Sequence, residues 1–167
     1  MISDQERVPT ITQHPAFVRT YPSTVIHCDR PVEGPLLMCG NCTPLPGDEV
    51  ELASSGRKYV LHRTDCRRAS WRMKLGKRAR VEWEDTGTLV FPVRMKVKMF
   101  PTKDAHQAVL RLVSTRHGRV LSSHMSPVRE EGVEGMEFLM ELPDREALEA
   151  LSDDLLKQKD IIVATRI

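Results

Sequence analysis

Three cysteines and one histidine near the middle of the chain have the spacing of a zinc site. Their order is C-x2-C, then nineteen residues, then H-x3-C, and the residues are Cys39, Cys42, His62 and Cys66. Zinc binds thiolate and imidazole ligands at four tetrahedral corners, and two turns that each supply two ligands reach these corners without backbone strain. The sequence therefore predicts a structural zinc ion (Zn2+) that joins two turns of the chain.

A redox-active C-x-x-C pair is the competing interpretation of Cys39 and Cys42. A pair of the thioredoxin kind needs a helix to start directly after it. Here the chain continues with Pro44, Pro46 and Gly47, which disfavour a helix. In a reducing cytosol, four cysteines are more often metal ligands or buried thiols than disulfides. We therefore expect zinc, with disulfides or free thiols as the alternatives.

Catalysis at the zinc ion is not expected. Four protein ligands leave no open coordination position for the water molecule that a zinc enzyme activates. The chain also contains no H-x-E or H-E-x-x-H arrangement that would place a glutamate base beside the metal. The sequence therefore predicts a protein that is not an enzyme and has no catalytic residues.

A dense group of basic residues overlaps the second pair of ligands. From Arg57 to Arg80 there are ten cations and a single acid, Asp65, although the net charge of the whole chain is only +2. Such a segment can neutralise several phosphates. The flat ring of Trp71 can stack on an unpaired base. The alternative is that this ring is buried within the protein. The residues predicted to bind nucleic acid are Arg57, Lys58, Arg63, Arg67, Arg68, Trp71, Arg72, Lys74, Lys77, Arg78 and Arg80.

Acidic residues gather in a different part of the chain. Residues 130–154 contain ten acids, with Arg145 as the single cation among them. This segregation gives the protein one basic surface that attracts phosphate and one acidic surface that repels it. The N-terminus is polar, and no stretch approaches the roughly 20 apolar residues that span a bilayer. We expect a cytoplasmic protein with no membrane partner.

The N-terminal half of the chain has few periodic segments. Prolines are spaced through residues 1–35 so that no long helix can form, and we expect an extended arm whose residues 23–28 add an edge strand. Residues 36–66 contain the ligand turns and short strands near 49–53 and 58–62. A knuckle of about thirty residues buries too little apolar surface to fold alone, so the metal is expected to supply folding free energy.

The C-terminal half has clear hydrophobic periodicity. Residues 91–99 alternate between apolar and mostly basic side chains, which predicts a strand with one apolar face. A helix with an apolar stripe at helical spacing follows, with Asp104 as its N-cap. Further strands are expected at 119–128, 135–142 and 161–167, and a second helix at 144–159. The predicted order is βαββαβ, a ferredoxin-like arrangement with both helices on one face of the sheet.

Taken in order, these motifs resemble the C-terminal regulatory region of long RelA/SpoT-type stringent-response proteins. The matching text is C-T-P-L-P-G-D-E-V from Cys42, G-R from Gly56, V-L-H-R-T-D-C from Val60, R-V-E-W from Arg80, and then the segment from about Val90 to Ile167. The resemblance implies a zinc-finger (conserved-cysteine) domain followed by an ACT domain, both of which sense the state of the ribosome and regulate (p)ppGpp synthesis and hydrolysis. The catalytic domains of RelA/SpoT-type GTP pyrophosphokinases are absent from this chain.

Two departures from the family pattern bear on the expected sites. The family has two adjacent cysteines before P-x-P-G-D, whereas this chain has Asn41 followed by Cys42. Cys39 is therefore the expected fourth ligand on local geometry, and Cys28 in the arm is the alternative. The loop after the first ACT strand, F-P-T-K-D-A from Phe100, lacks the glycine that lets the backbone approach an amino-acid ligand in small-molecule-binding members. We therefore expect no amino-acid effector.

The predicted organisation is an extended arm over residues 1–35, a zinc-finger domain with the basic segment over 36–80, and an ACT domain over 81–167. This α+β chain is predicted to be a regulatory module of the stringent response that binds ribosomal or other structured RNA. The alternative is a protein-interaction module that pairs through its ACT domain with a second copy, as a homodimer, or with a RelA/SpoT-type enzyme. Met1 and an arm unlike the family favour a stand-alone chain over a fragment.

Overall fold

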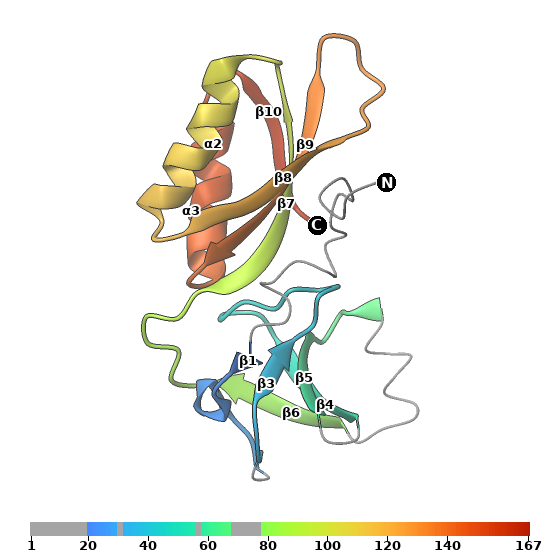
Figure 1. Ribbon diagram of the computed structural model, residues 1–167, viewed down its shortest axis with the longest axis vertical. Helices are drawn as coiled ribbons and strands as arrows, with labels where there is room; N and C mark the ends of the chain where they lie inside the picture. Colours follow the sequence, from blue (N-terminus) through green and yellow to red (C-terminus); the bar gives the residue numbers. More distant parts are fainter. Residues whose placement is uncertain (1–19, 30–31, 56–57, 68–77) are drawn as a thin grey trace, which may run out of the picture. The chain divides into compact units, whose positions relative to one another are not determined.

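The computed structural model describes residues 20–29, 32–55, 58–67 and 78–167. These residues fall into two units (Figure 1). The first unit contains the described residues up to Cys42 together with those of Glu49–Asp85, and the second contains Thr43–Asp48 and Thr86–Ile167. Each unit has its own sheet, and both helices belong to the second unit. The predicted mixed α+β class is confirmed.

The first unit is built on a six-stranded sheet with the strand order β1-β3-β5-β4-β6-β2. The central strands β5 and β4 form an antiparallel hairpin, and β3 runs parallel to β5 on one side of it. The strands are β1 (Thr20–Tyr21), β2 (Ile26–His27), β3 (Leu36–Met38), β4 (Val50–Ser55), β5 (Lys58–Arg63) and β6 (Arg78–Trp83).

The two edge strands of this sheet come from adjacent parts of the chain. Only Pro22 and the short 3-10 turn η3 (Ser23–Val25) separate β1 from β2. Because each residue spans at most about 3.6 Å, the two edges lie close together, and the sheet must curl toward a closed barrel. The side chains of Leu36 in β3, Leu61 in β5 and Val25 in η3 are completely buried.

The first unit is larger than the predicted zinc knuckle. Residues 20–27, which the sequence assigned to the arm, supply both edge strands. Strand β6 crosses the predicted boundary at residue 80 and pairs with β4, where Val81 lies opposite Val50 and both side chains are buried. This apolar pairing draws β6 into the first unit, so the boundary lies after that strand.

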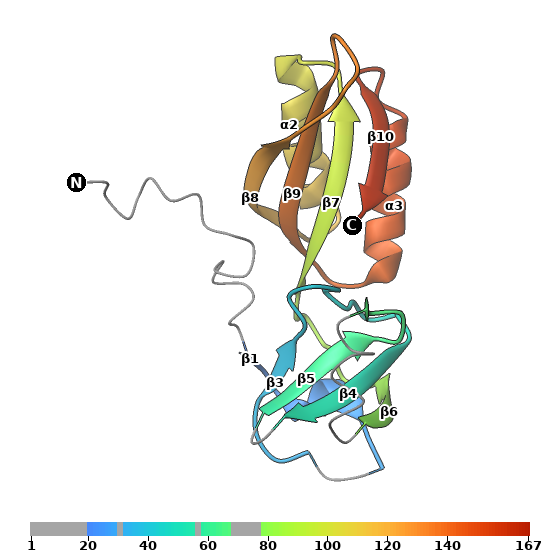
Figure 2. The same ribbon diagram turned by 90° about the vertical axis from the view of Figure 1, so that its right-hand side faces the viewer.

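The second unit is a four-stranded antiparallel sheet with two helices on one face, as Figure 2 shows. Val109 and Val113 of the first helix and Leu151 and Leu155 of the second are completely buried against it. The strand order is β10-β7-β9-β8. The elements are β7 (Phe91–Met99), α2 (Lys103–Thr115), β8 (Arg119–Ser126), β9 (Glu134–Leu142), α3 (Arg145–Leu156) and β10 (Ile161–Arg166).

The pairing of β7 with β9 explains the charged rows in the sequence. Lys96 lies opposite Glu137, while Val97 lies opposite Met136 on the other face of the sheet. Opposite charges directly across a strand pair stabilise a sheet by about 0.2–1 kcal/mol. Glu137 also lies beside β8, with its Oε2 atom 2.7 Å from Nε2 of His124. The charged face is therefore matched across neighbouring strands.

The two helices begin at side-chain caps. Helix α2 is capped by Thr102 rather than by Asp104, because Thr102 Oγ1 accepts a hydrogen bond from Ala105 N at 3.2 Å. Asp104 lies in the first turn instead, where its charge favours the helix dipole. Helix α3 is capped by Asp144, whose Oδ1 accepts from Ala147 N at 2.7 Å. Neither helix, nor any other in the described part of the chain, is long and apolar enough to cross a membrane.

Candidate metal centre

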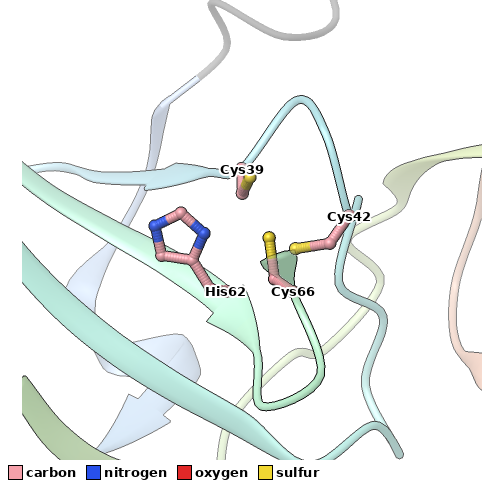
Figure 3. Close-up of side chains that lie close together, drawn as sticks. All are labelled: Cys39, Cys42, His62 and Cys66. Carbon is pink, nitrogen blue, oxygen red and sulfur yellow. The ribbon is translucent and has the colours of Figure 1, made fainter. Parts of the chain in front are cut away.

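Four buried side chains of the first unit converge on one point. The ligand atoms of Cys39, Cys42, His62 and Cys66 all lie within 4.8 Å of one another, and each residue is at most 7% exposed. Figure 3 shows the three sulfur atoms and one ring nitrogen of the histidine directed toward a common space. The half-buried Cys28 does not belong to this group. The structure thus brings the four residues of the sequence motif together.

A parallel strand pair places the two halves of the motif side by side. Strand β3 runs parallel to β5, so their C-terminal ends meet at the same edge of the sheet. Cys39 directly follows β3, and its N–H donates to the carbonyl oxygen of Leu61 at 2.9 Å. His62 is the next residue of β5. Cys66 comes after a turn in which its N–H donates to the carbonyl oxygen of Arg63 at 3.0 Å.

Three N–H groups are directed at the sulfur atoms. The backbone N–H of Asn41 donates to Cys39 Sγ at 3.4 Å, and that of Arg63 donates to Cys42 Sγ at 3.2 Å. The side-chain Nδ2 of Asn41 donates to Cys66 Sγ at 3.9 Å. Such donors stabilise negative charge on sulfur, which is the form that binds a metal. Asn41 therefore contributes hydrogen bonds at the position where the family pattern has a cysteine.

The two thiols of the C-x-x-C motif share a proton. The pKa of Cys39 is lowered to about 3, mainly by a hydrogen bond with Cys42; burial opposes this shift, and the neighbouring His62 contributes to it. The same hydrogen bond, together with burial, raises the pKa of Cys42. Without a cation the pair therefore holds one thiolate and one thiol. A bound metal ion favours loss of the second proton as well, because ligating thiols are deprotonated.

The residues present fit a metal ion. The Nδ1 atom of His62 is buried and has no hydrogen-bond partner among the described residues, which is costly for a polar atom that no ligand satisfies. A tetrahedral ion with metal–sulfur bonds of about 2.3 Å separates its ligands by about 3.8 Å, so a small inward adjustment closes the group around it. Four protein ligands complete such a shell. The arrangement suits a structural metal rather than a catalytic one.

The residues predicted to bind nucleic acid are only partly described. Arg67, which directly follows the ligand Cys66, and Arg80 in β6 are exposed. Arg63 is half-buried, and its Nε lies 3.2 Å from Oδ1 of Asp65. The backbones of Lys58 and Arg78 lie in β5 and β6, and the residues outside the described parts are Arg57, Arg68, Trp71, Arg72, Lys74 and Lys77. Nucleic-acid binding by this set therefore stays a prediction.

Asp48 is a buried acid for which the sequence indicated only a turn. Its Oδ2 accepts a hydrogen bond from Leu45 N at 2.8 Å and another from Arg166 Nη2 at 2.7 Å. The P-G-D motif predicts the turn, but Arg166 lies 118 residues further along the chain. No local sequence signal connects the two residues.

No family model and no curated protein matches the chain. Among solved structures, it is similar to the ACT domain from GTP pyrophosphokinase of Chlorobium tepidum. The two sequences are 11% identical, the match covers 47% of this chain and 100% of that chain, and the TM-score is 0.39. It is also similar to the C-terminal domain of the MgtC protein from Mycobacterium tuberculosis, with 15% identity, 50% and 90% covered, and a TM-score of 0.41. These similarities are too distant to assign a family.

Proposed function

We propose that the chain is a non-catalytic regulatory module in which a structural zinc ion holds a basic segment in the form that binds structured RNA. The observation that carries this proposal is the buried group of Cys39, Cys42, His62 and Cys66, with all ligand atoms within 4.8 Å of one another. Soft thiolates with one imidazole and no open position are typical of structural zinc sites. In such a site the metal contributes folding free energy rather than chemistry.

Within the basic segment, the part between the last metal ligand and strand β6 is held at both of its ends in the first unit. The last ligand, Cys66, directly precedes Arg67, while Arg78 begins β6. Strand β6 pairs with β4, and β4 pairs on its other side with β5, which carries His62. A cationic segment with both ends fixed loses less conformational freedom on binding phosphates than a free tail does. The metal therefore supports RNA binding without touching the RNA.

The resemblance to RelA/SpoT-type proteins supports ribosomal RNA as the target and control of (p)ppGpp metabolism in the cytoplasm as the process. On this proposal the second unit is an ACT domain, since its elements run strand-helix-strand-strand-helix-strand with the first and third strands adjacent. The loop from Phe100 to Ala105 has no glycine, and Thr102 within it caps α2. These features support a packing role for the loop rather than a role in binding an amino acid.

RNA binding by the full chain is expected to require both the metal and low salt. A structured ribosomal RNA fragment would be titrated with the zinc-loaded and the chelator-treated chain while the salt concentration is raised. With about five phosphate contacts, affinity should fall by roughly 500-fold between about 50 and 200 mM salt. The chelator-treated chain should bind far more weakly at every concentration. An RNA affinity that changes neither with salt concentration nor after chelator treatment would contradict the proposed function.

A protein-interaction role is the second candidate, and an exposed methionine favours it. Strand β8 is an edge of the four-stranded sheet, and Met125 on this strand is 70% exposed. An apolar side chain on an edge strand offers a pairing surface to another chain. Light scattering of the full chain is then expected to show a dimer, and Met125→Glu a monomer. A wild-type monomer at high concentration that binds RNA tightly would exclude pairing with a second copy.

A further inference from the structure

One arginine holds both ends of the segment that follows the second metal ligand. Residues Thr43–Asp48 come directly after Cys42 and belong to the second unit. In β10, Arg166 donates from Nη1 to Asp48 Oδ1 at 2.9 Å and from Nη2 to Asp48 Oδ2 at 2.7 Å. The same Nη2 also donates to the carbonyl oxygen of Thr43 at 2.7 Å. The segment is thus fixed at its first and last residues.

The middle of the segment is held as well. The backbone N–H of Arg145, at the start of α3, donates to the carbonyl oxygen of Pro46 at 2.8 Å. The side chain of Leu45 is completely buried. The side chains of Arg166 and Asp48 are only 15% and 5% exposed, so their two-point contact is shielded from water and stronger than a surface ion pair. These contacts fix residues Thr43–Asp48 within the second unit.

Thr43 has a strained backbone at the point where the chain leaves the metal ligand. Its φ angle is 43°, in the left-handed region that a β-branched residue rarely adopts. Such a conformation persists only where surrounding contacts impose it, and the hydrogen bond from Arg166 to the Thr43 carbonyl is one of those contacts. Because Thr43 is bonded to Cys42, its conformation sets the direction in which the chain leaves the ligand turn.

We propose that Arg166 and Asp48 are positioning residues for the metal site, so that metal binding and anchoring of the segment are thermodynamically coupled. Anchoring restricts the freedom of Cys42 and lowers the entropy cost of closing the ligand group around the ion. The coupling is reciprocal, so a metal that fixes Cys42 also favours the anchored segment and protects β10. This proposal rests on the proposed zinc site and adds that the anchor of residues Thr43–Asp48, which begin next to Cys42, sets how tightly the zinc is held.

Arg166→Gln is expected to weaken zinc binding by about tenfold, measured on the full chain by competition with a chromophoric chelator. The matched control is Arg116→Gln, which removes another arginine–aspartate pair of the second unit, with Arg116 Nη2 at 2.6 Å from Asp154 Oδ2. This control should bind zinc as the wild type does. If the wild type binds no zinc, the proposed metal site itself fails. If it binds zinc and Arg166→Gln binds equally tightly, only the coupling fails.

A glycine at position 43 separates positioning from general stabilisation. Thr43→Gly removes the steric cost of the positive φ angle, so the double variant Thr43→Gly/Arg166→Gln should regain part of the lost zinc affinity. Because Thr43 belongs to the second unit, thermal unfolding of that unit is followed in the same variants. A zinc affinity that recovers only in proportion to the stability of the second unit, or a double variant no better than Arg166→Gln, overturns the positioning role. Should Arg166→Gln fail to fold, Arg166→Lys serves instead, because it keeps the charge without the two-point contact.

Hydrogen exchange tests the reciprocal direction in the wild type. Zinc removal is expected to speed exchange of the β10 amides, Ile161–Arg166, several-fold relative to those of β8, which is the opposite edge strand of the same sheet. Equal exchange of β10 with and without zinc overturns the coupling.

Discussion

Cys66→Ser is expected to abolish zinc retention and to unfold the first unit. A serine hydroxyl does not replace a thiolate ligand, and three remaining ligands leave the shell open. A structural zinc ion contributes on the order of 10 kcal/mol to folding, which is comparable with the whole stability of a small domain. Elemental analysis of the purified chain would show about one zinc per wild-type chain and close to none in the variant. Circular dichroism would report the loss of the first sheet.

The chain provides its own control for this result. Cys28→Ser removes the thiol that lies outside the cluster and should leave both zinc content and fold unchanged. Cys39→Ser should behave like Cys66→Ser, because its sulfur lies within the cluster. Zinc retained by Cys39→Ser, or lost from Cys28→Ser, would show that the ligand set is wrong.

Charge reversal after the last metal ligand is expected to reduce RNA affinity on the order of 10³-fold. The triple variant Arg67→Glu/Arg68→Glu/Arg72→Glu removes three cations and adds three anions that repel phosphate. Binding of the same structured RNA would be measured at one fixed salt concentration, because the size of the effect depends on screening. Zinc content should not change, since none of the three residues is a ligand.

A second triple variant tests whether the place of the charges matters. Lys103→Glu/Arg111→Glu/Lys159→Glu changes the net charge by the same amount, but at three exposed positions of the second unit. Its RNA affinity should fall by far less than that of the first variant. An equal loss of RNA affinity in both variants would mean that affinity depends on the total charge of the protein. The basic segment would then have no special role.

The sequence by itself determined the chemistry of the site and the elements with strong periodicity. The spacing of Cys39, Cys42, His62 and Cys66 selects the ligands, because local turns bring each pair together regardless of the rest of the fold. Strand β7 covers the predicted residues, 91–99, since apolar and basic side chains alternate along it from Val93 to Met99. The sequence predicted Asp104 as the N-cap of α2, whereas the structure has Thr102, because both residue types are favourable caps near the start of a helix.

Only the tertiary structure decided how the short segments are used. Strand β1 has two residues, too few for a periodic pattern, and it becomes a strand because β3 provides a partner. Strand β2 lies within residues 23–28, where the sequence indicated an edge strand, but the sequence did not indicate its partner, β6. The contact between Asp48 and Arg166 joins residues 118 positions apart, so no local pattern contains it. Such pairings depend on which surfaces meet after the chain has folded, and that information lies in the packing rather than in any one segment.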